Sequence, residues 1–428
     1  MVGTALATSS GARRVLVARD TRVSGLMLEN ALISGILSAG ADVEQCGVLP
    51  TPVLAYLTRE THADAGVMIT ASHNPSQYNG IKLFNGEGMA YDEESQNRVE
   101  DVVERRRFKR ASWRDIGRSS FSDQTHLYMA KVAGEVKLRR RWYVMVDPGC
   151  GATYHVAPAL LTRVGCTVKA LNAQPDGHFP ARIPEPNAQS VAGVAEVAKA
   201  FGVDAGFAYD GDGDRVAFID EGGSFVDFDR AFSAYAAHVV KRSGGGVVVT
   251  NVEASMSVEK MVEAHGGSVV RVKVGDIHIS RAVKQHDAVF GGEPCGAWIH
   301  PQFHLCPDGV LSSALLLKAL EETEKRLSDF VSEAPQYPTV REKVECANEE
   351  KQELVQKSEE GLKQAFPEYR ELSTIDGLRL RLEGGWVLVR ASGTEPAVRI
   401  TAEGESLKEA REIADTAVAV VKQLVRRA

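Results

Sequence analysis

A serine in a polar loop that directly follows an apolar run is the first candidate for chemistry in this chain. Ser72 lies in T-A-S-H-N-P, residues 70–75, behind the apolar run Ala65–Ile69, and Lys82 supplies a cation shortly afterwards. Such a run predicts a buried strand, and α/β folds place reactive side chains at strand ends because the rigid backbone aims them. The competing interpretation is a structural turn in which Asn74 hydrogen-bonds nearby backbone.

Three alternating carboxylates form the strongest metal-binding pattern. Asp210, Asp212 and Asp214 are separated by single glycines in D-G-D-G-D-R. The glycines allow a tight loop, and converging carboxylate oxygens suit a hard cation such as Mg²⁺. An EF-hand is the alternative, because Glu221 falls where its last ligand would stand. Arg215, however, occupies the position at which the EF-hand turn needs glycine.

A third loop, G-G-E-P-C-G, presents one carboxylate after a strand expected at Ala288–Phe290. Glu293 could pair with sugar hydroxyls, or it could be a solvated residue in a structural turn. Zinc is a further alternative, because four potential ligands follow one another closely, namely Cys295, His300, His304 and Cys306. The paired cysteine knuckles typical of structural zinc sites are missing from this run.

A fourth loop, R-A-S-G-T-E-P, follows the strand expected at Trp386–Val389. Its guanidinium, its two hydroxyls and a glycine that permits close backbone approach could clamp a phosphate. A plain β-turn is the equally favoured alternative. The residues concerned are Arg390, Ser392, Gly393 and Thr394, with Arg399 a few positions later.

Composition places the chain among ordinary globular proteins. With 428 residues the chain is too long for a single core. Its content of 44% hydrophobic and 25% charged residues is typical of a soluble protein. A net charge of −7 argues against a general nucleic-acid surface, so phosphate groups would need local cations. The six scattered cysteines indicate reduced thiols, and no apolar run is long enough for a membrane span. We expect a cytoplasmic protein, with self-association into a homo-oligomer left open.

The motifs must be positioned by a chain that alternates strands and helices. Strand–helix–strand patterns recur three times, and a proline-rich break at Ala334–Pro338 precedes a charged helical segment and short alternating strands. We therefore expect an α/β protein with three similar mixed-sheet domains, residues 1–139, 140–227 and 228–333, followed by a smaller α+β domain, residues 334–428.

The four motifs in this order resemble the α-D-phosphohexomutase superfamily. T-A-S-H-N-P, D-G-D-G-D-R, G-G-E-P-C-G and R-A-S-G-T-E-P match its phosphoserine, metal, sugar and phosphate loops, and the likeness runs from about Val15 to the C-terminus. It implies three α/β domains of shared topology and a fourth domain like the TATA-binding protein, arranged around a central cleft.

The resemblance also implies a role for each motif. Ser72 would carry and transfer a phosphoryl group and would join the three aspartates in holding Mg²⁺. His73, Lys82 and Arg215 would supply charge and proton transfer. Asp276, Glu293 and Cys295 would face the sugar. The distal phosphate would be bound by Arg390, Ser392, Gly393, Thr394 and Arg399.

Within the superfamily, G-G-E-P-C-G-A-W-I and Val274-Gly275-Asp276 resemble the archaeal phosphoglucosamine mutase branch. That branch implies interconversion of the 6- and 1-phosphates of glucosamine, with a hexose or hexosamine 1,6-bisphosphate as intermediate and activator. The alternatives are a phosphomannomutase or phosphoglucomutase with the same mechanism, and a catalytically silent homologue.

The N-terminus departs from the family pattern. Family members open with a G-T-x-G-x-R-G strand and loop whose arginine faces the phosphoserine, whereas this chain starts within the following helix, at Thr4–Thr8. We expect Val15–Ala18 to form a sheet that lacks its usual first partner. We also expect that Met1 is not the natural start of a working enzyme and that upstream sequence encodes the missing strand and loop.

Overall fold

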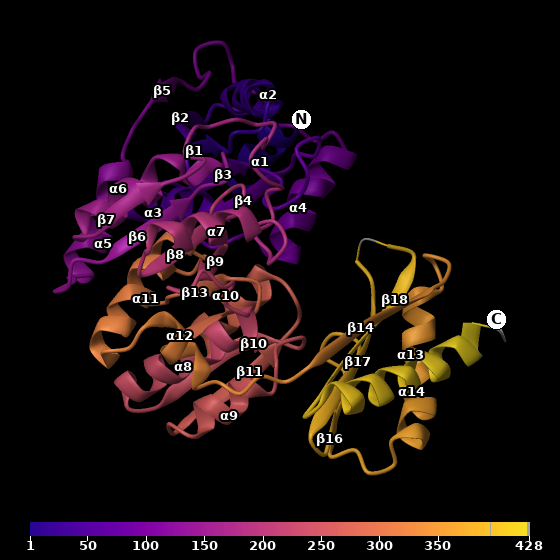
Figure 1. Cartoon of the computed structure of the whole chain (residues 1–428). Coiled ribbons are helices and arrows are strands. Elements are labelled where there is room, and N and C mark those ends of the chain that lie inside the picture. Colours follow the sequence, from indigo (N-terminus) through magenta and orange to yellow (C-terminus); the bar gives the residue numbers. More distant parts are fainter. Residues whose placement is uncertain (394, 426–428) are drawn as a thin grey trace.

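The computed structural model describes residues 1–393 and 395–425 of the chain. It contains four β-sheets, and each is built from one contiguous part of the sequence. The first three sheets and their helices form one large body, and the C-terminal unit lies to one side of it (Figure 1). The expected fold class, three mixed-sheet α/β units and a C-terminal α+β unit, is confirmed.

The N-terminal sheet has the strand order β4-β3-β1-β2-β5, and its edge strand β4 runs antiparallel to β3 while the other neighbours are parallel. Its elements are α1 (Val2–Ser10), β1 (Arg14–Arg19), α2 (Gly25–Ser38), β2 (Asp42–Val48), α3 (Thr51–Glu60), β3 (Ala65–Ile69), β4 (Ile81–Asn85), α4 (Glu93–Glu104), β5 (Ser119–Phe121) and α5 (Thr125–Glu135). The helix expected at Thr4–Thr8 is α1. The strand expected at Val15–Ala18 is β1, which lies between β2 and β3, and the expectation that the sheet lacks the family's usual first strand stays a prediction.

The second and third sheets repeat this plan, in the orders β7-β6-β8-β9 and β11-β10-β12-β13. The second unit consists of β6 (Tyr143–Asp147), the 3-10 helix η1 (Ala152–Tyr154), α6 (Val156–Arg163), β7 (Thr167–Ala170), α7 (Ala192–Phe201), β8 (Ala205–Tyr209) and β9 (Val216–Ile219). The third consists of α8 (Phe228–Ser243), β10 (Gly246–Asn251), α9 (Ser257–Glu263), β11 (Gly267–Val272), α10 (Asp276–Gln285), β12 (Phe290–Glu293), β13 (Ala297–Ile299), α11 (Gly309–Thr323) and α12 (Leu327–Ser332).

The shared plan puts the first three motifs in equivalent places. In each unit the last parallel strand turns back into an antiparallel edge strand, as β3–β4, β8–β9 and β12–β13. The Ser72 loop, the aspartate loop and the Glu293 turn are these three hairpin connections. The carboxyl ends of parallel strands meet at one edge of a sheet, so such connections are natural positions for a binding site.

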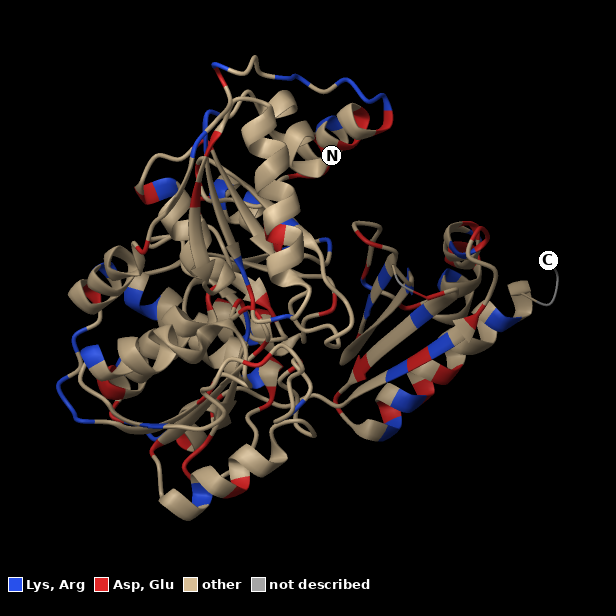
Figure 2. Ribbon diagram, turned by 90° about the horizontal axis from the view of Figure 1, so that it is seen from above, with Lys and Arg blue, Asp and Glu red and all other residues tan. Residues whose placement is uncertain are grey.

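The C-terminal sheet is antiparallel, in the order β14-β18-β17-β16-β15. Its elements are β14 (Thr339–Glu345), α13 (Lys351–Ala365), β15 (Glu371–Ser373), β16 (Leu378–Leu382), β17 (Gly385–Ala391), β18 (Ala397–Gly404) and α14 (Leu407–Val425). One face of α14 is buried, and its outer side carries alternating acidic and basic residues (Figure 2). The fourth motif is again a hairpin connection, between β17 and β18.

The cores explain why the C-terminal unit stands apart. One apolar cluster is continuous through the first three units, whereas α13, α14 and their sheet enclose a cluster of their own. Trp386 and Leu388 on the opposite face of that sheet pack against Val252 of the third unit. The six cysteines are free, as expected, and no helix in the described ranges is long and apolar enough to cross a membrane.

Candidate active site

Ser72 lies in the β3–β4 connection and faces the aspartate loop. Its hydroxyl donates a hydrogen bond to Oδ2 of Asp210 at 2.7 Å, and Nδ1 of His73 lies 3.4 Å from Oγ of Ser72. The residue is only 7% exposed, and its backbone adopts a left-handed conformation with φ of 49°. That conformation is unfavourable for a residue other than glycine, so the surrounding contacts must hold the loop in place.

Arg22 supplies those contacts. Its guanidinium is fully buried and donates hydrogen bonds to four backbone carbonyls of the Ser72 loop, those of Ser72, Asn74, Pro75 and Tyr78, at 2.7–2.9 Å. It also pairs with Asp20 at 2.9 Å.

Asp20 in turn accepts a hydrogen bond from Thr70, whose hydroxyl accepts the backbone N–H of Ser72. The sequence analysis missed both Arg22 and Asp20. They lie in the charged loop after β1, and β1 pairs with β3 in parallel. The loops that follow these two strands therefore lie at the same edge of the sheet, and this was the signal that could have identified Arg22 and Asp20.

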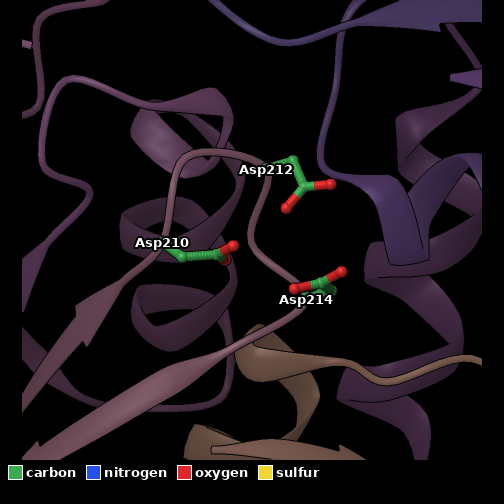
Figure 3. A group of neighbouring side chains, drawn as sticks. All are labelled: Asp210, Asp212 and Asp214. Atoms are coloured by element: carbon green, nitrogen blue, oxygen red, sulfur yellow. The ribbon is translucent and has the colours of Figure 1, made fainter. Parts of the chain in front are cut away.

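The three aspartates converge as their spacing predicted. Asp210, Asp212 and Asp214 are buried, and one carboxylate oxygen from each lies within 4.8 Å of the others (Figure 3). Oδ1 of Asp212 and Oδ1 of Asp214 are buried without a hydrogen-bond partner. Two buried oxygens without donors beside a third carboxylate are what a hard divalent cation needs, so these residues fit such an ion.

Lys82 neutralises part of this charge. Its ammonium group lies 2.9 Å from Oδ2 of Asp212 and 2.7 Å from Oδ2 of Asp214. Burial alone would lower the pKa of Lys82, but the two carboxylates raise it well above its usual value, so the side chain stays cationic. Thr51 donates a further hydrogen bond to Asp212 at 2.6 Å. Thr51 begins α3 and was missed, because nothing near it in the sequence marks it as a partner of Asp212.

The acidic groups differ in their proton affinity because they differ in their partners. Burial and the charges of its neighbours Asp214 and Asp212 raise the pKa of Asp210 well above its usual range. Burial would also raise that of Asp212, but Lys82 and several hydrogen bonds hold its pKa below the ordinary value. Burial and Arg215 lower the pKa of His73 to about 4, so its imidazole is neutral at pH 7.

Glu293 belongs to the end of a strand. β12 continues through Gly291 and Gly292 to Glu293, which corrects the expectation of a strand that ends at Phe290. Oε1 of Glu293 accepts hydrogen bonds from Nδ2 of Asn251 at 2.8 Å and from the backbone of Gly275 at 2.9 Å.

These contacts bring Asp276, at the start of α10, beside Glu293, and burial raises the pKa of Glu293. Cys295 lies close enough to Arg215 for a negative charge on its sulfur to interact with the guanidinium. Burial, however, raises the pKa of the Cys295 thiol to about 12. Cys295 and Glu293 interact electrostatically with Arg215, and Asp276 with Lys82, so the three residues lie near the aspartate loop.

The fourth motif, which was expected to bind phosphate, lies in the C-terminal unit. Arg390 contacts two carboxylates, Glu253 at 2.6 Å and Asp376 at 3.6 Å, and it makes no ion pair with the aspartate loop in the described part of the chain. Ser392 is buried, and Lys351 donates to its carbonyl oxygen at 2.7 Å. Gly393 is exposed, and Thr394 lies outside the described residues. Arg399 lies opposite Arg390 on the neighbouring strand β18 and forms an ion pair with Glu395 at 3.1 Å.

Two alternative metal sites are not supported. Glu221 binds the hydroxyl of Ser328, and the aspartate loop joins two strands, so the EF-hand interpretation is wrong. The imidazoles of the zinc alternative are engaged elsewhere, His300 with Ser312 and His304 with Asp308, each at 2.9 Å. Among the described residues, the aspartate loop is the group with the geometry of a metal site.

The chain matches all four domain models of one family. They are described as phosphoglucomutase/phosphomannomutase domains I, II, III and the C-terminal domain, and they match residues 1–110, 126–223, 227–337 and 342–420. With four domains in this order and the site at their hairpin connections, the chain belongs to the phosphoglucomutase/phosphomannomutase family.

Individual proteins are also similar to this chain in sequence or in structure. A probable phosphoglucosamine mutase of Methanothermobacter thermautotrophicus is 43% identical over 96% of this chain and 90% of its own length. One from Pyrococcus furiosus is 40% identical over 100% of this chain and 94% of its own length. A family member from Burkholderia thailandensis has a similar solved structure, with a TM-score of 0.88 and 27% identity, covering 98% of this chain and 93% of that one. The expected family is thus confirmed.

Proposed function

We propose that this protein is a phosphoglucosamine mutase that interconverts glucosamine 6-phosphate and glucosamine 1-phosphate. The observation that carries the proposal is the hydrogen bond of 2.7 Å between the Ser72 hydroxyl and Asp210, beside the other two aspartates and Lys82. The choice of sugar rests on archaeal relatives that are named probable phosphoglucosamine mutases. They are about 40% identical to this chain over nearly its full length.

One phosphoryl group passes from Ser72 to the sugar, and a different one then passes from the sugar to Ser72. In the first transfer the bond between phosphorus and Oγ of Ser72 breaks, and a bond to the free sugar hydroxyl forms, giving the 1,6-bisphosphate. After the bisphosphate turns round, the other phosphoryl group returns to Ser72. Such transfers depend on in-line positioning and on neutralising the oxygens of the group in flight, rather than on a strong nucleophile.

The residues around Ser72 match these needs. Lys82 and Arg215 supply positive charge beside the aspartates. His73, with Nδ1 at 3.4 Å from Oγ of Ser72, is placed to exchange the proton of the attacking or leaving hydroxyl. The three aspartates and an oxygen on phosphorylated Ser72 would hold Mg²⁺. When bound, the ion would offset the charge of the phosphoryl group.

The other end of the substrate would be bound by the third and fourth units. Glu293 and Asp276 offer carboxylates to the sugar, with Cys295 beside them, and Arg390 with Ser392, Gly393 and Thr394 would offer donors to the second phosphate. The two phosphates exchange places between the transfers, so the distal site must accept either end of the molecule. A 1,6-bisphosphate that dissociates would leave Ser72 unphosphorylated, which is why we expect added bisphosphate to activate the enzyme.

The test is turnover of glucosamine 6-phosphate in the presence of Mg²⁺ and a trace of glucosamine 1,6-bisphosphate, followed by phosphorus NMR. Ser72→Ala should abolish it, while Ser76→Ala, a change of the same size in the same loop, should leave it largely intact. Wild-type protein that is active yet never carries phosphate on Ser72, by mass analysis without priming, would contradict the proposal. Relative kcat/KM for glucosamine, mannose and glucose phosphates decides the sugar, and no turnover of any would indicate a silent homologue.

A further inference from the structure

Arg390, the cation at the end of β17, is engaged by carboxylates. Its Nη2 donates to Oε1 of Glu253 at 2.6 Å, and its Nη1 lies 3.6 Å from Oδ2 of Asp376. Its Nε is buried without a hydrogen-bond partner. The guanidinium side chain is only 16% exposed, so little water screens these contacts.

The two carboxylates come from different units. Asp376 lies in the turn between β15 and β16, in the same antiparallel sheet as Arg390. Glu253 lies between β10 and α9, in the third unit. The pair of Glu253 and Arg390 therefore spans the junction between the large body and the C-terminal unit, two parts with separate cores.

The formal charges oppose phosphate binding at this guanidinium. One cation between two carboxylates has a net charge of −1, and a sugar phosphate brings about two more negative charges near pH 7. Arg390 and Asp376 belong to the same unit, although Oδ2 of Asp376 also accepts the backbone N–H of Val274 in the third unit at 3.2 Å. Glu253 is then the carboxylate whose contact with Arg390 depends on the placement of the C-terminal unit.

We propose that Glu253 is a positioning residue that competes with the substrate's distal phosphate for Arg390 across the junction of the third and fourth units. The inference rests on the proposed function, in which Arg390 binds that phosphate. Phosphate binding would release Glu253 and leave Asp376 to hold the guanidinium. The ion pair thereby lowers the affinity for phosphosugar and for inorganic phosphate alike.

The test is Glu253→Gln, which keeps the shape of the side chain and removes its charge. We expect KM for the phosphosugar and the inhibition constant of inorganic phosphate to fall together, by about three- to tenfold, with a smaller change in kcat. Glu263→Gln is the matched control, because Glu263 is an exposed glutamate at the end of the neighbouring helix α9 and has no ion-pair partner among the described residues. It should behave like the wild type, and Glu253→Asp, which keeps the charge, should lie closer to the wild type than Glu253→Gln.

A double variant assigns the effect to Arg390. In an Arg390→Ala background, adding Glu253→Gln should change neither constant, since the shared cation is gone. An unchanged or higher KM in Glu253→Gln, or a lower melting temperature with unchanged constants, would overturn the inference and leave a structural ion pair. Calorimetric titration with inorganic phosphate needs no turnover. It therefore still tests Glu253 if the enzyme proves inactive on glucosamine phosphates, which is the separate failure of the proposed function.

Discussion

Replacing Arg22 by methionine should disable the Ser72 loop without touching Ser72 itself. The guanidinium donates to four carbonyl oxygens between Ser72 and Tyr78 and pairs with Asp20, and both charged side chains are fully buried. Methionine has a similar length but offers no donor. The left-handed backbone at Ser72, φ of 49°, would lose the contacts that stabilise it.

Two magnitudes follow from these contacts. Breaking a buried ion pair by removing one partner costs about 3–5 kcal/mol, because the other charge is left uncompensated. The loss of the four carbonyl contacts should let the loop relax. A displacement of Ser72 by about 1 Å relative to the aspartates would reduce kcat by about a hundredfold. We therefore expect a large loss of turnover together with a lower melting temperature.

Arg19→Met is the matched control. Arg19 is the last residue of β1, directly before the loop that contains Arg22, and it pairs with Glu29 at 2.9 Å. It makes no described contact with the Ser72 loop. This variant should lose some stability while it keeps turnover within a few-fold of the wild type. Melting temperature and mutase rate should be measured for both variants at a temperature where both are folded. A folded Arg22→Met protein with wild-type turnover would refute the view that Arg22 positions Ser72.

Three further outcomes are expected. Asp212→Asn should weaken Mg²⁺ binding and lower kcat, and an unchanged dependence of the rate on Mg²⁺ would speak against the metal site. Arg390→Ala should raise KM about 10–150-fold, the equivalent of roughly 1.5–3 kcal/mol for a lost charged hydrogen bond, whereas a selective fall in kcat would contradict a clamp. Burial raises the pKa of Asp229 from its ordinary value of 3.8 to about 7, so the folded state binds a proton that the unfolded state releases. The free energy of unfolding therefore falls as pH rises from about 4 to 7, because the unfolded state gains from releasing the Asp229 proton. Asp229→Asn should flatten the fall in melting temperature over this range.

Local patterns were enough to predict the fold class and the individual loops. The alternation of Asp210, Asp212 and Asp214 with glycine places their carboxylates together within one hairpin, because neighbours in a tight turn cannot lie far apart. Apolar runs such as Ala65–Ile69 indicated buried strands for the same local reason. The length of β12 was misjudged, because Gly291 and Gly292 are typical of a turn, and pairing with β13, together with that of Gly291 with β10, keeps them in the sheet.

The partners of those loops were decided by the tertiary structure. Arg22 and the Ser72 loop, Thr51 and Asp212, and Glu253 and Arg390 come from different elements, and the last two pairs join different units. A residue type limits which contacts a side chain can make, but not which distant side chain will be present. Strand order and the packing of units bring such segments together, and these depend on the burial of many apolar side chains at once. The sequence therefore determined what each loop could bind, and the packing of the four units determined which charges each loop meets.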